Sequence, residues 1–194
     1  METRKIIIAT NNKGKVIEFK RVLEPLGFNV ITQAEAGILS NPEETGATFA
    51  ENAEIKAKTL FEHIKTYVVA DDSGLVIDAL PGLLGVHSAR FEPGKDYIQK
   101  CEKILALMKD VPKHRRAARF ISALYLITPD GETKQFTGIC EGYIGDELQG
   151  ENGFGFDPVF YINGKSFASL SAEEKDAVSH RGKALRALAD EIGE

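Results

Sequence analysis

The chain has 194 residues, of which 43% are hydrophobic and 27% are charged, proportions typical of a globular protein that can bury a substantial core. Its net charge of -5 argues against a long nucleic-acid-binding surface, although a single nucleotide needs only a local group of cations. No segment approaches the ~18 to 20 consecutive apolar residues of a membrane span, and residues 1–4 lack the apolar core of a signal peptide. We therefore expect a cytoplasmic protein that binds neither nucleic acid polymers nor membranes.

Strands and helices are predicted to alternate along the chain without a linker, an internal repeat or a low-complexity segment. In chain order, we expect a strand at 5–9, a helix from Asn12 to about residue 26, a strand at 29–32, a helix at 48–66 and strands at 67–70 and 75–79. These are followed by a helix at 95–109, a hairpin of long strands at 117–128 and 134–143, a short strand at 159–162 and helices after residue 171. Asn12 is a predicted N-cap, and Thr48 and Ser171 each begin a capping-box pattern.

The segment Asp-Asp-Ser-Gly at 71–74 is the most informative part of the chain. It predicts a turn between two strands, at which one carboxylate faces a cleft while the other anchors the backbone. Carboxylate oxygens at such an edge suit Mg2+, which shares the rest of its coordination shell with water and phosphate oxygens. The alternative is an Asx-type turn that only separates two strands.

The segment 10–15, Thr-Asn-Asn-Lys-Gly-Lys, joins the first predicted strand to the first helix. Backbone N–H groups at a helix N-terminus carry partial positive charge, and two lysines with small polar side chains would complete a phosphate site. The spacing is not that of a P-loop, and an ordinary capped loop is the alternative. Glu43 and Glu44 are candidate metal ligands or simply solvated residues, and Asn52 and Lys56 behind them face one way on a helix.

Gly-Phe-Gly-Phe-Asp-Pro at 153–158 places two aromatic rings between glycines, which allow the backbone to approach a ligand closely. An aromatic platform beside a carboxylate suits a nucleobase, whereas the alternative is a bulged strand that enters the core. Lys175 and the pair His180 and Arg181 would supply donors to the base edge and to phosphate; otherwise the pair belongs to an exposed linker between two helices.

Taken together with Ser-Ala-Arg-Phe at 88–91, these segments resemble, in order, the inosine triphosphate pyrophosphatase family, most nearly its bacterial dITP/XTP pyrophosphatase branch. The resemblance spans about residues 6–188. It implies a Mg2+-dependent hydrolase that cleanses the nucleotide pool by cleaving non-standard purine nucleoside triphosphates, such as ITP, dITP and XTP, to the monophosphate and pyrophosphate. It also implies an α/β fold in which a long, mixed, twisted sheet with flanking helices forms two lobes around an active-site cleft, as a single domain over 1–194 and as a homodimer.

Asp72 matches the family's catalytic and metal-binding aspartate, and one of Glu43 and Glu44 matches its second metal ligand; we favour Glu43. The predicted substrate-binding residues are Thr10, Asn11, Asn12, Lys13, Gly14, Lys15, Lys56, Ser73, Phe154, Gly155, Phe156, Asp157, Lys175, His180 and Arg181. The chain departs from the family pattern at Asn11, where glycine is common, and at Phe156, where tyrosine or tryptophan is usual.

The residues are consistent with this chemistry. Asp72, supported by Asp71, would orient and deprotonate the water that attacks the α-phosphorus, and the 6-oxo group of the base would accept from His180, Arg181 or a backbone N–H. Guanine also carries a 6-oxo group, so its exclusion depends on its 2-amino group. Two rival hypotheses are a pyrophosphatase of another modified nucleotide and a nucleotide sensor without turnover.

Overall fold

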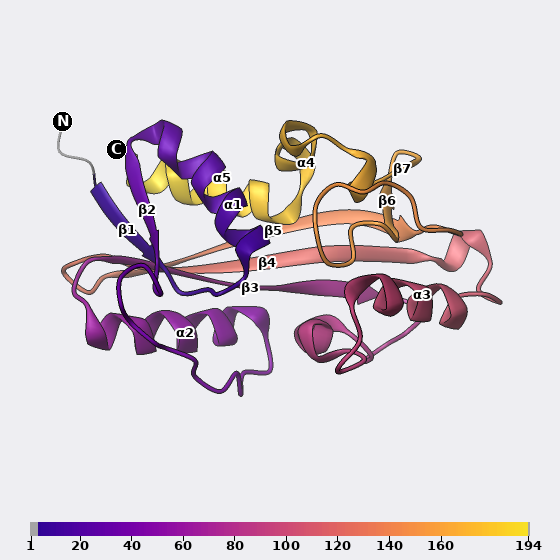
Figure 1. The fold of residues 1–194 in the computed structure, drawn as a ribbon, viewed down its shortest axis with the longest axis horizontal. Helices are drawn as coiled ribbons and strands as arrows, with labels where there is room; N and C mark the ends of the chain where they lie inside the picture. The colour runs from indigo at the N-terminus through magenta and orange to yellow at the C-terminus, as the bar shows by residue number, and fades with distance from the viewer. Residues whose placement is uncertain (1–3, 194) are drawn as a thin grey trace. The chain divides into compact units, whose positions relative to one another are not determined.

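The computed structural model describes residues 4–193. Residues 1–3, which belong to the segment that lacks a signal-peptide core, and residue 194 of the predicted domain lie outside the described residues. Within 4–193, seven strands form one open sheet in the order β2-β1-β3-β4-β5-β6-β7 (Figure 1). The sheet is mixed, because β1 is parallel to both β2 and β3 whereas β6 is antiparallel to β5 and β7. The predicted mixed sheet with flanking helices is therefore confirmed.

The strands are β1 (Arg4–Ile8), β2 (Phe28–Thr32), β3 (Tyr67–Ile77), β4 (Ala117–Ile127), β5 (Thr133–Ile144), β6 (Phe160–Ile162) and β7 (Lys165–Ser166). The α-helices are α1 (Lys13–Leu23), α2 (Phe49–His63), α3 (Tyr97–Leu107), α4 (Ala172–Val178) and α5 (His180–Ile192). Short 3-10 helices are η1 (Glu24–Leu26), η2 (Gly85–Arg90), η3 (Lys113–Arg115) and η4 (Phe167–Ser169). Among the described residues, no helix combines the length and the apolar character needed to cross a membrane.

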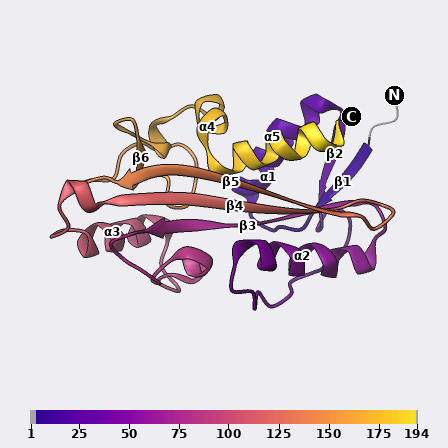
Figure 2. The same ribbon diagram turned by 180° about the vertical axis from the view of Figure 1, so that it is seen from behind.

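The chain divides into two compact units. Of the described residues, the first unit comprises 4–72, 122–138 and 181–193, and the second unit comprises 73–121 and 139–180. In the first unit, α1 and α5 cover one face of the strands and α2 covers the other (Figures 1 and 2). In the second unit, residues of α3, β6 and η4 share one apolar core, which contains Ile104, Phe160 and Phe167.

Strand β1 shows why the first unit has two apolar layers. Successive side chains of a strand point to opposite faces, so Ile6 and Ile8 pack with α1 and α5 while Ile7 packs with α2. All three are buried, so residues 6–8 of β1 form a continuous apolar run, as expected where a parallel strand is covered on both sides.

The helix starts follow the predicted caps. The Asn12 side chain accepts a hydrogen bond from the N–H of Lys15, and Thr48 and Ser171 each begin a complete capping box. The predicted pair of helices after residue 171 is present as α4 and α5, but His180 and Arg181 form the first turn of α5 instead of a linker.

The prediction of a turn at 71–74 is wrong, because β3 continues without interruption from Tyr67 to Ile77. Asp71 and Asp72 are both buried, and each has charged or hydrogen-bonding partners on its own face of the strand. These tertiary contacts outweigh the turn preference of the local sequence. The consequence for the site is that strand alternation directs the two carboxylates to opposite faces.

Candidate active site

A partly buried cluster of lysines and carboxylates lies in the first unit, where α1 and α2 flank β3. Lys15, on the first turn of α1, places Nζ 2.7 Å from Oδ2 of Asp71. Lys56, on α2, places Nζ 3.1 Å from Oδ1 of Asp72 and donates to the Asp71 carbonyl oxygen at 2.8 Å. The structure therefore brings together three predicted site residues, Lys15, Lys56 and Asp72, around one strand.

Asp71 is the centre of an ion-pair network on one face of β3. Nε and Nη2 of Arg181 lie 3.3 and 3.2 Å from its Oδ2, and Ser122 Oγ donates to its Oδ1 at 2.6 Å. Arg181 also donates to the buried carboxylate of Glu18 on α1. Burial alone would raise the pKa of Asp71, but Arg181, Lys15 and Ser122 hold that pKa well below its usual range. The lowered pKa favours the charged form of Asp71, the partner of Arg181 and Lys15.

Asp72 occupies a different environment on the opposite face. Its Oδ2 accepts a hydrogen bond from Nδ2 of Asn52 at 3.2 Å, and its side chain is largely buried. Burial raises the pKa of Asp72, and the nearby charges of Lys56 and Lys15 offset that rise only in part. A raised pKa makes the Asp72 carboxylate a better proton acceptor than an exposed aspartate.

The two lysines respond in opposite ways to the same surroundings. Burial lowers the pKa of Lys15, and the attraction of Asp71 does not fully restore it. Burial also acts to lower the pKa of Lys56, but Asp72, Glu44 and Asp71 together raise it overall. Lys56 therefore remains a cation, which suits a contact with phosphate.

Glu44 is the member of the glutamate pair that reaches the cluster. Its Oε1 lies 3.2 Å from Nζ of Lys56, the same ammonium that contacts Asp72, whereas the Glu43 side chain is exposed. The position of Glu44 therefore does not support our preference for Glu43. Two carboxylates converging on one cation are hard oxygen donors of the kind that Mg2+ takes.

Two carboxylates are the candidate metal ligands of this cluster. Among the described residues, no three His, Cys, Asp or Glu side chains converge to hold a metal ion. Mg2+ commonly binds through one or two carboxylates and completes its octahedron with water and substrate phosphates. Asp72 and Glu44 match that chemistry.

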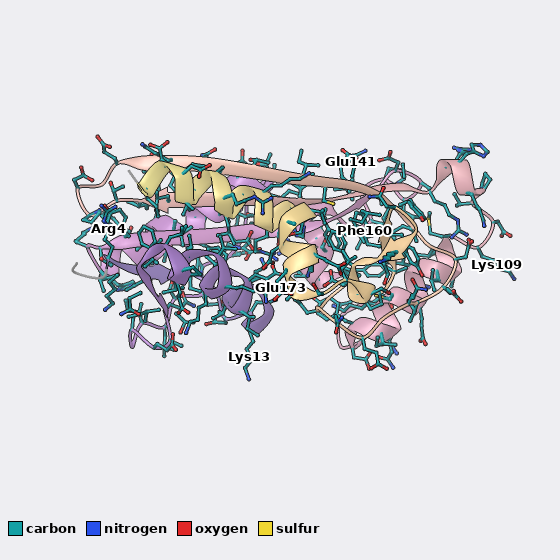
Figure 3. All side chains as sticks on the ribbon, turned by 90° about the horizontal axis from the view of Figure 1, so that it is seen from above. Arg4, Lys13, Lys109, Glu141, Phe160 and Glu173 are labelled. Atoms are coloured by element: carbon teal, nitrogen blue, oxygen red, sulfur yellow. The ribbon has the colours of Figure 1, made fainter. Side chains whose placement is uncertain are left out.

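The loop before α1 is held by its own side chains. Thr10 Oγ1 accepts from the Asn12 N–H at 3.1 Å, and Asn11 Oδ1 accepts from Nε2 of Gln33 at 3.1 Å. Among the described residues other than glycine, only Glu92 and Asn163 have a positive φ, so the backbone at Asn11 does not require glycine. The loop directs Lys15 to the carboxylates, whereas Lys13 extends into solvent (Figure 3).

The second unit holds the aromatic loop. Oδ2 of Asp157 accepts from the Phe154 N–H at 2.9 Å and from Nζ of Lys175 at 2.6 Å. That ammonium lies 4.6 Å from the centroid of the half-buried Phe154 ring. Gly153 has φ +72°, and a Cβ there would lie 2.0 Å from Oδ2 of Asp157. Phe154, Asp157 and Lys175, all predicted site residues, are therefore brought together around a loop that needs glycine.

Phe156, unlike the half-buried Phe154, is packed into the core. It is only 5% exposed and packs edge-on against Tyr97, with ring centroids 5.3 Å apart, and beside Phe91. Phe156 therefore enters the core, as the alternative expected, although it lies in a loop and not in a bulged strand. Its position does not support stacking on a base. Gly155, between the two phenylalanines, also has a positive φ.

The other predicted substrate-binding residues, His180, Arg181 and Ser73, do not form one cluster: the first and third belong to the second unit and Arg181 to the first. His180 is buried in the second unit, where its ring stacks on Phe120 at 4.7 Å with planes 12° apart. Arg181 belongs to the first unit and directs three nitrogens at the carboxylates described above. Ser73 is half-buried in β3, directly after Asp72. Base reading by His180 or Arg181 stays a prediction.

Three residues of the cluster were not predicted as site residues. Asn52 had a usable signal, because it precedes Lys56 by four residues on the same helix face. Glu18 and Ser122 had none, since their partners Arg181 and Asp71 are distant in sequence. Such pairs are set by the fold and leave no local pattern.

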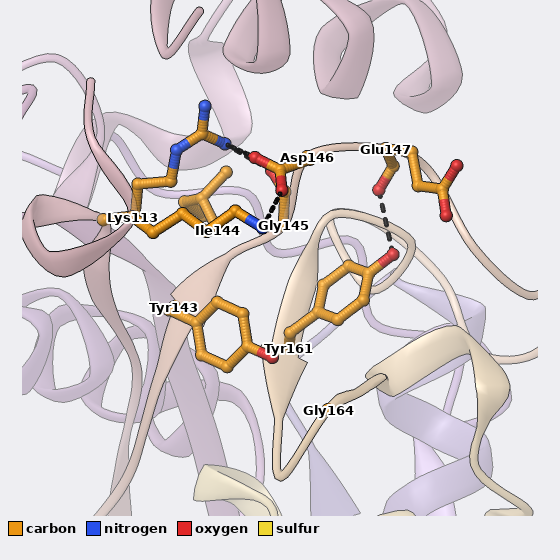
Figure 4. A pocket seen from close by; sticks show the side chains of 9 residues that line it. Lys113, Tyr143, Ile144, Gly145, Asp146, Glu147, Tyr161 and Gly164 are labelled. Atoms are coloured by element: carbon orange, nitrogen blue, oxygen red, sulfur yellow. Dashed lines mark hydrogen bonds and ion pairs between the residues drawn. The ribbon is translucent and has the colours of Figure 1, made fainter. Parts of the chain in front are cut away.

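The second unit also contains a cavity of about 450 Å³ that includes none of the predicted site residues (Figure 4). Three of its charged residues are paired with one another: Asp146 lies 3.2 Å from Lys113 and 3.1 Å from Arg116. The Tyr161 hydroxyl donates to the Glu147 carbonyl oxygen at 3.0 Å. This cavity is lined by a structural network, and we assign it no role in the site.

Partly buried lysines lie beside buried carboxylates, close to a helix N-terminus. This arrangement defines an α/β protein equipped to bind phosphorylated ligands. The chain belongs to the Ham1 family, whose model matches residues 6–191. It is 45% identical to a dITP/XTP pyrophosphatase from Bacillus cereus, covering 100% of this chain and 98% of that protein. It is 47% identical to one from Bacillus subtilis, covering 95% of each. Among solved structures, a Ham1 protein from Staphylococcus aureus is 38% identical with a TM-score of 0.85, covering 97% of this chain and 98% of that one. The resemblance read from the sequence is confirmed.

Proposed function

We propose that this protein is a Mg2+-dependent nucleoside triphosphate pyrophosphatase that hydrolyses dITP, XTP and ITP to the monophosphate and pyrophosphate. The Bacillus relatives named dITP/XTP pyrophosphatase, similar over nearly their whole length, support the substrate class. The observation that carries the proposal is Asp72, a buried carboxylate held between Asn52 and Lys56 with a raised pKa.

The first unit supplies the groups that act on the phosphates. Lys15, Lys56 and the N-terminus of α1 would neutralise and orient the triphosphate, since phosphoryl transfer depends mainly on position and charge. Asp72 and Glu44 would hold Mg2+, which when bound offsets phosphate charge and increases the acidity of water.

Asp72 is the proposed catalytic base. It accepts a proton from water as the water oxygen forms a bond to the α-phosphorus, and the bond between the α-phosphorus and the bridging oxygen breaks to release pyrophosphate. Asp71 cannot share this task, because Arg181, Lys15 and Ser122 hold its pKa far below that of a useful base. Its role is to keep Lys15 and Arg181 in place.

The loop at 153–157 is the proposed base-binding element. Phe154 offers a partly exposed ring for stacking, and Asp157 and Lys175 fix the backbone beneath that ring. Selection for a 6-oxo purine requires a hydrogen-bond donor aimed at the 6-oxygen. Adenine has an amino group at that position, so the donor would be left unpaired. Lys175, whose ammonium lies 4.6 Å from the centroid of the Phe154 ring, is one candidate donor, and His180 and Arg181 are the other two.

The deciding experiment measures pyrophosphate release from dITP, XTP, ITP, ATP and GTP, each with Mg2+ and with EDTA. We expect release from the first three that is lost in EDTA. Nucleotide binding without release would favour the sensor hypothesis, and turnover confined to a modified pyrimidine triphosphate would favour the other rival. We further propose that the chain acts in the cytoplasm as a single domain and forms a homodimer. Light scattering of the purified protein would test the homodimer.

A further inference from the structure

Asn52 links two parts of the proposed site. It lies on the first turns of α2 with a relative exposure of 0%. Its Oδ1 accepts from the Gly46 N–H at 2.8 Å, and its Nδ2 donates to Oδ2 of Asp72 at 3.2 Å. One amide group therefore connects the loop that carries Glu44 to the carboxylate on β3.

The direction of this amide is fixed by its surroundings. A backbone N–H can only donate, so the Gly46 N–H requires the oxygen of Asn52, and the amide nitrogen must then face Asp72. The second oxygen of Asp72 is contacted by Lys56. The Asp72 carboxylate is thus held at both oxygens, and its rotation is set by Asn52 and Lys56 together.

The loop end of the link is equally restricted. A Cβ at Gly46 would lie 2.6 Å from Oδ1 of Asn52 and 2.7 Å from Cβ of Glu51, so only glycine permits this approach. The next residues are fixed by the capping box, in which Glu51 accepts from the N–H groups of Ala47 and Thr48. Glu44 lies two residues before Gly46 and so follows the position of this anchored backbone.

We propose that Asn52 is a positioning residue that fixes Asp72 and the Glu44 loop relative to each other, so that both carboxylates can bind the same Mg2+ ion. The inference rests on the proposed function, because it concerns how the metal-binding carboxylates are placed. Partners that orient metal ligands commonly change metal affinity or activity by ~10- to 100-fold when removed. Asn52 is expected to act in this range.

The test compares Asn52→Ala and Gly46→Ala with wild type. Gly46→Ala breaks the same link from the loop side without opening a buried cavity, so it decides the matter if Asn52→Ala fails to fold. The control is Thr59→Val, which removes a hydroxyl of α2 that donates to Ile55 O, one turn back on the same helix. For each protein we would measure kcat and KM for dITP, the Kd for Mg2+ alone by calorimetry, and thermal unfolding.

We expect both link variants to lower kcat and to weaken Mg2+ binding by ~10- to 100-fold, with KM for dITP changed by less than about threefold. The control should match wild type. A merely structural Asn52 would lower the unfolding temperature but leave kcat and the Kd for Mg2+ of the folded variant unchanged, and that result would overturn the inference. If wild type releases no pyrophosphate from dITP, the proposed function fails, while the Mg2+ affinities still decide whether Asn52 positions the carboxylates.

Discussion

Asp71 and Asp72 are neighbours in sequence whose pKa values shift in opposite directions. Strand β3 directs one carboxylate to the Arg181 side and the other to the Lys56 side, so adjacent residues of one type acquire separate tasks. Asp71 is held charged by Arg181 and Lys15, whereas Asp72, which pairs with Lys56, has the raised pKa that suits a base. The pair therefore divides stability from catalysis.

At the residue scale, Asp72→Asn should reduce turnover of dITP by at least ~100-fold, because it removes the proton acceptor and a metal ligand while keeping the shape. Initial rates with Mg2+, together with circular dichroism to confirm folding, would measure this. Asp78→Asn, at an exposed position six residues further on, is the matched control. A folded Asp72→Asn variant with near-normal rates would remove Asp72 from the mechanism.

At the element scale, the sequence predicts best what is local. The capping boxes at Thr48 and Ser171 place the starts of α2 and α4 correctly, because a cap needs only residues three apart. The break predicted in β3 is wrong, because burial of both carboxylates depends on partners from other elements. The aromatic loop is an intermediate case. Its glycines predict a backbone with positive φ angles, but packing against Tyr97 decides which of the two rings enters the core.

The loop at 153–157 provides a prediction with a matched control. Gly153→Ala would place a Cβ against Asp157 and displace it from the Phe154 N–H and from Lys175. Gly164 also has a positive φ but has nothing within 4 Å of the same position, so Gly164→Ala carries the backbone strain without the clash.

We expect Gly153→Ala to raise KM for dITP by about tenfold, with a smaller change in kcat, because the base platform moves while the phosphate site is intact. Gly164→Ala should leave both constants near wild type. Equal effects of the two variants on KM would show that backbone strain, and not the Asp157 contact, determines substrate binding.

At the scale of the whole molecule, the network around Asp71 joins segments that are far apart in the chain. Glu18 of α1, Asp71 of β3, Ser122 of β4 and Arg181 of α5 all belong to the first unit, so the early, central and last parts of the sequence meet there. No local pattern in the sequence predicts this, since each pair depends on the completed fold. Breaking a buried ion pair from one side is costly, because the remaining charge stays buried.

Asp71→Asn should therefore lower the free energy of unfolding by about 3 kcal/mol at neutral pH, because Arg181 and Lys15 lose a buried counter-charge. The sign of the pH dependence follows from the lowered pKa of Asp71. Below the ordinary aspartate pKa of about 4, the unfolded chain binds a proton that the native state does not, so wild type loses this stability as the pH falls.

Urea unfolding of wild type and Asp71→Asn across the acid range would measure this difference, with the exposed Asp190→Asn on α5 as the control. The gap between wild type and Asp71→Asn should be constant above about pH 5 and should narrow as the pH falls below about 4, whereas the control should follow wild type throughout. A gap that widens in acid would mean that Asp71 is protonated in the native state. The buried cations would then be balanced by Glu18, and the separation of roles between Asp71 and Asp72 would be lost.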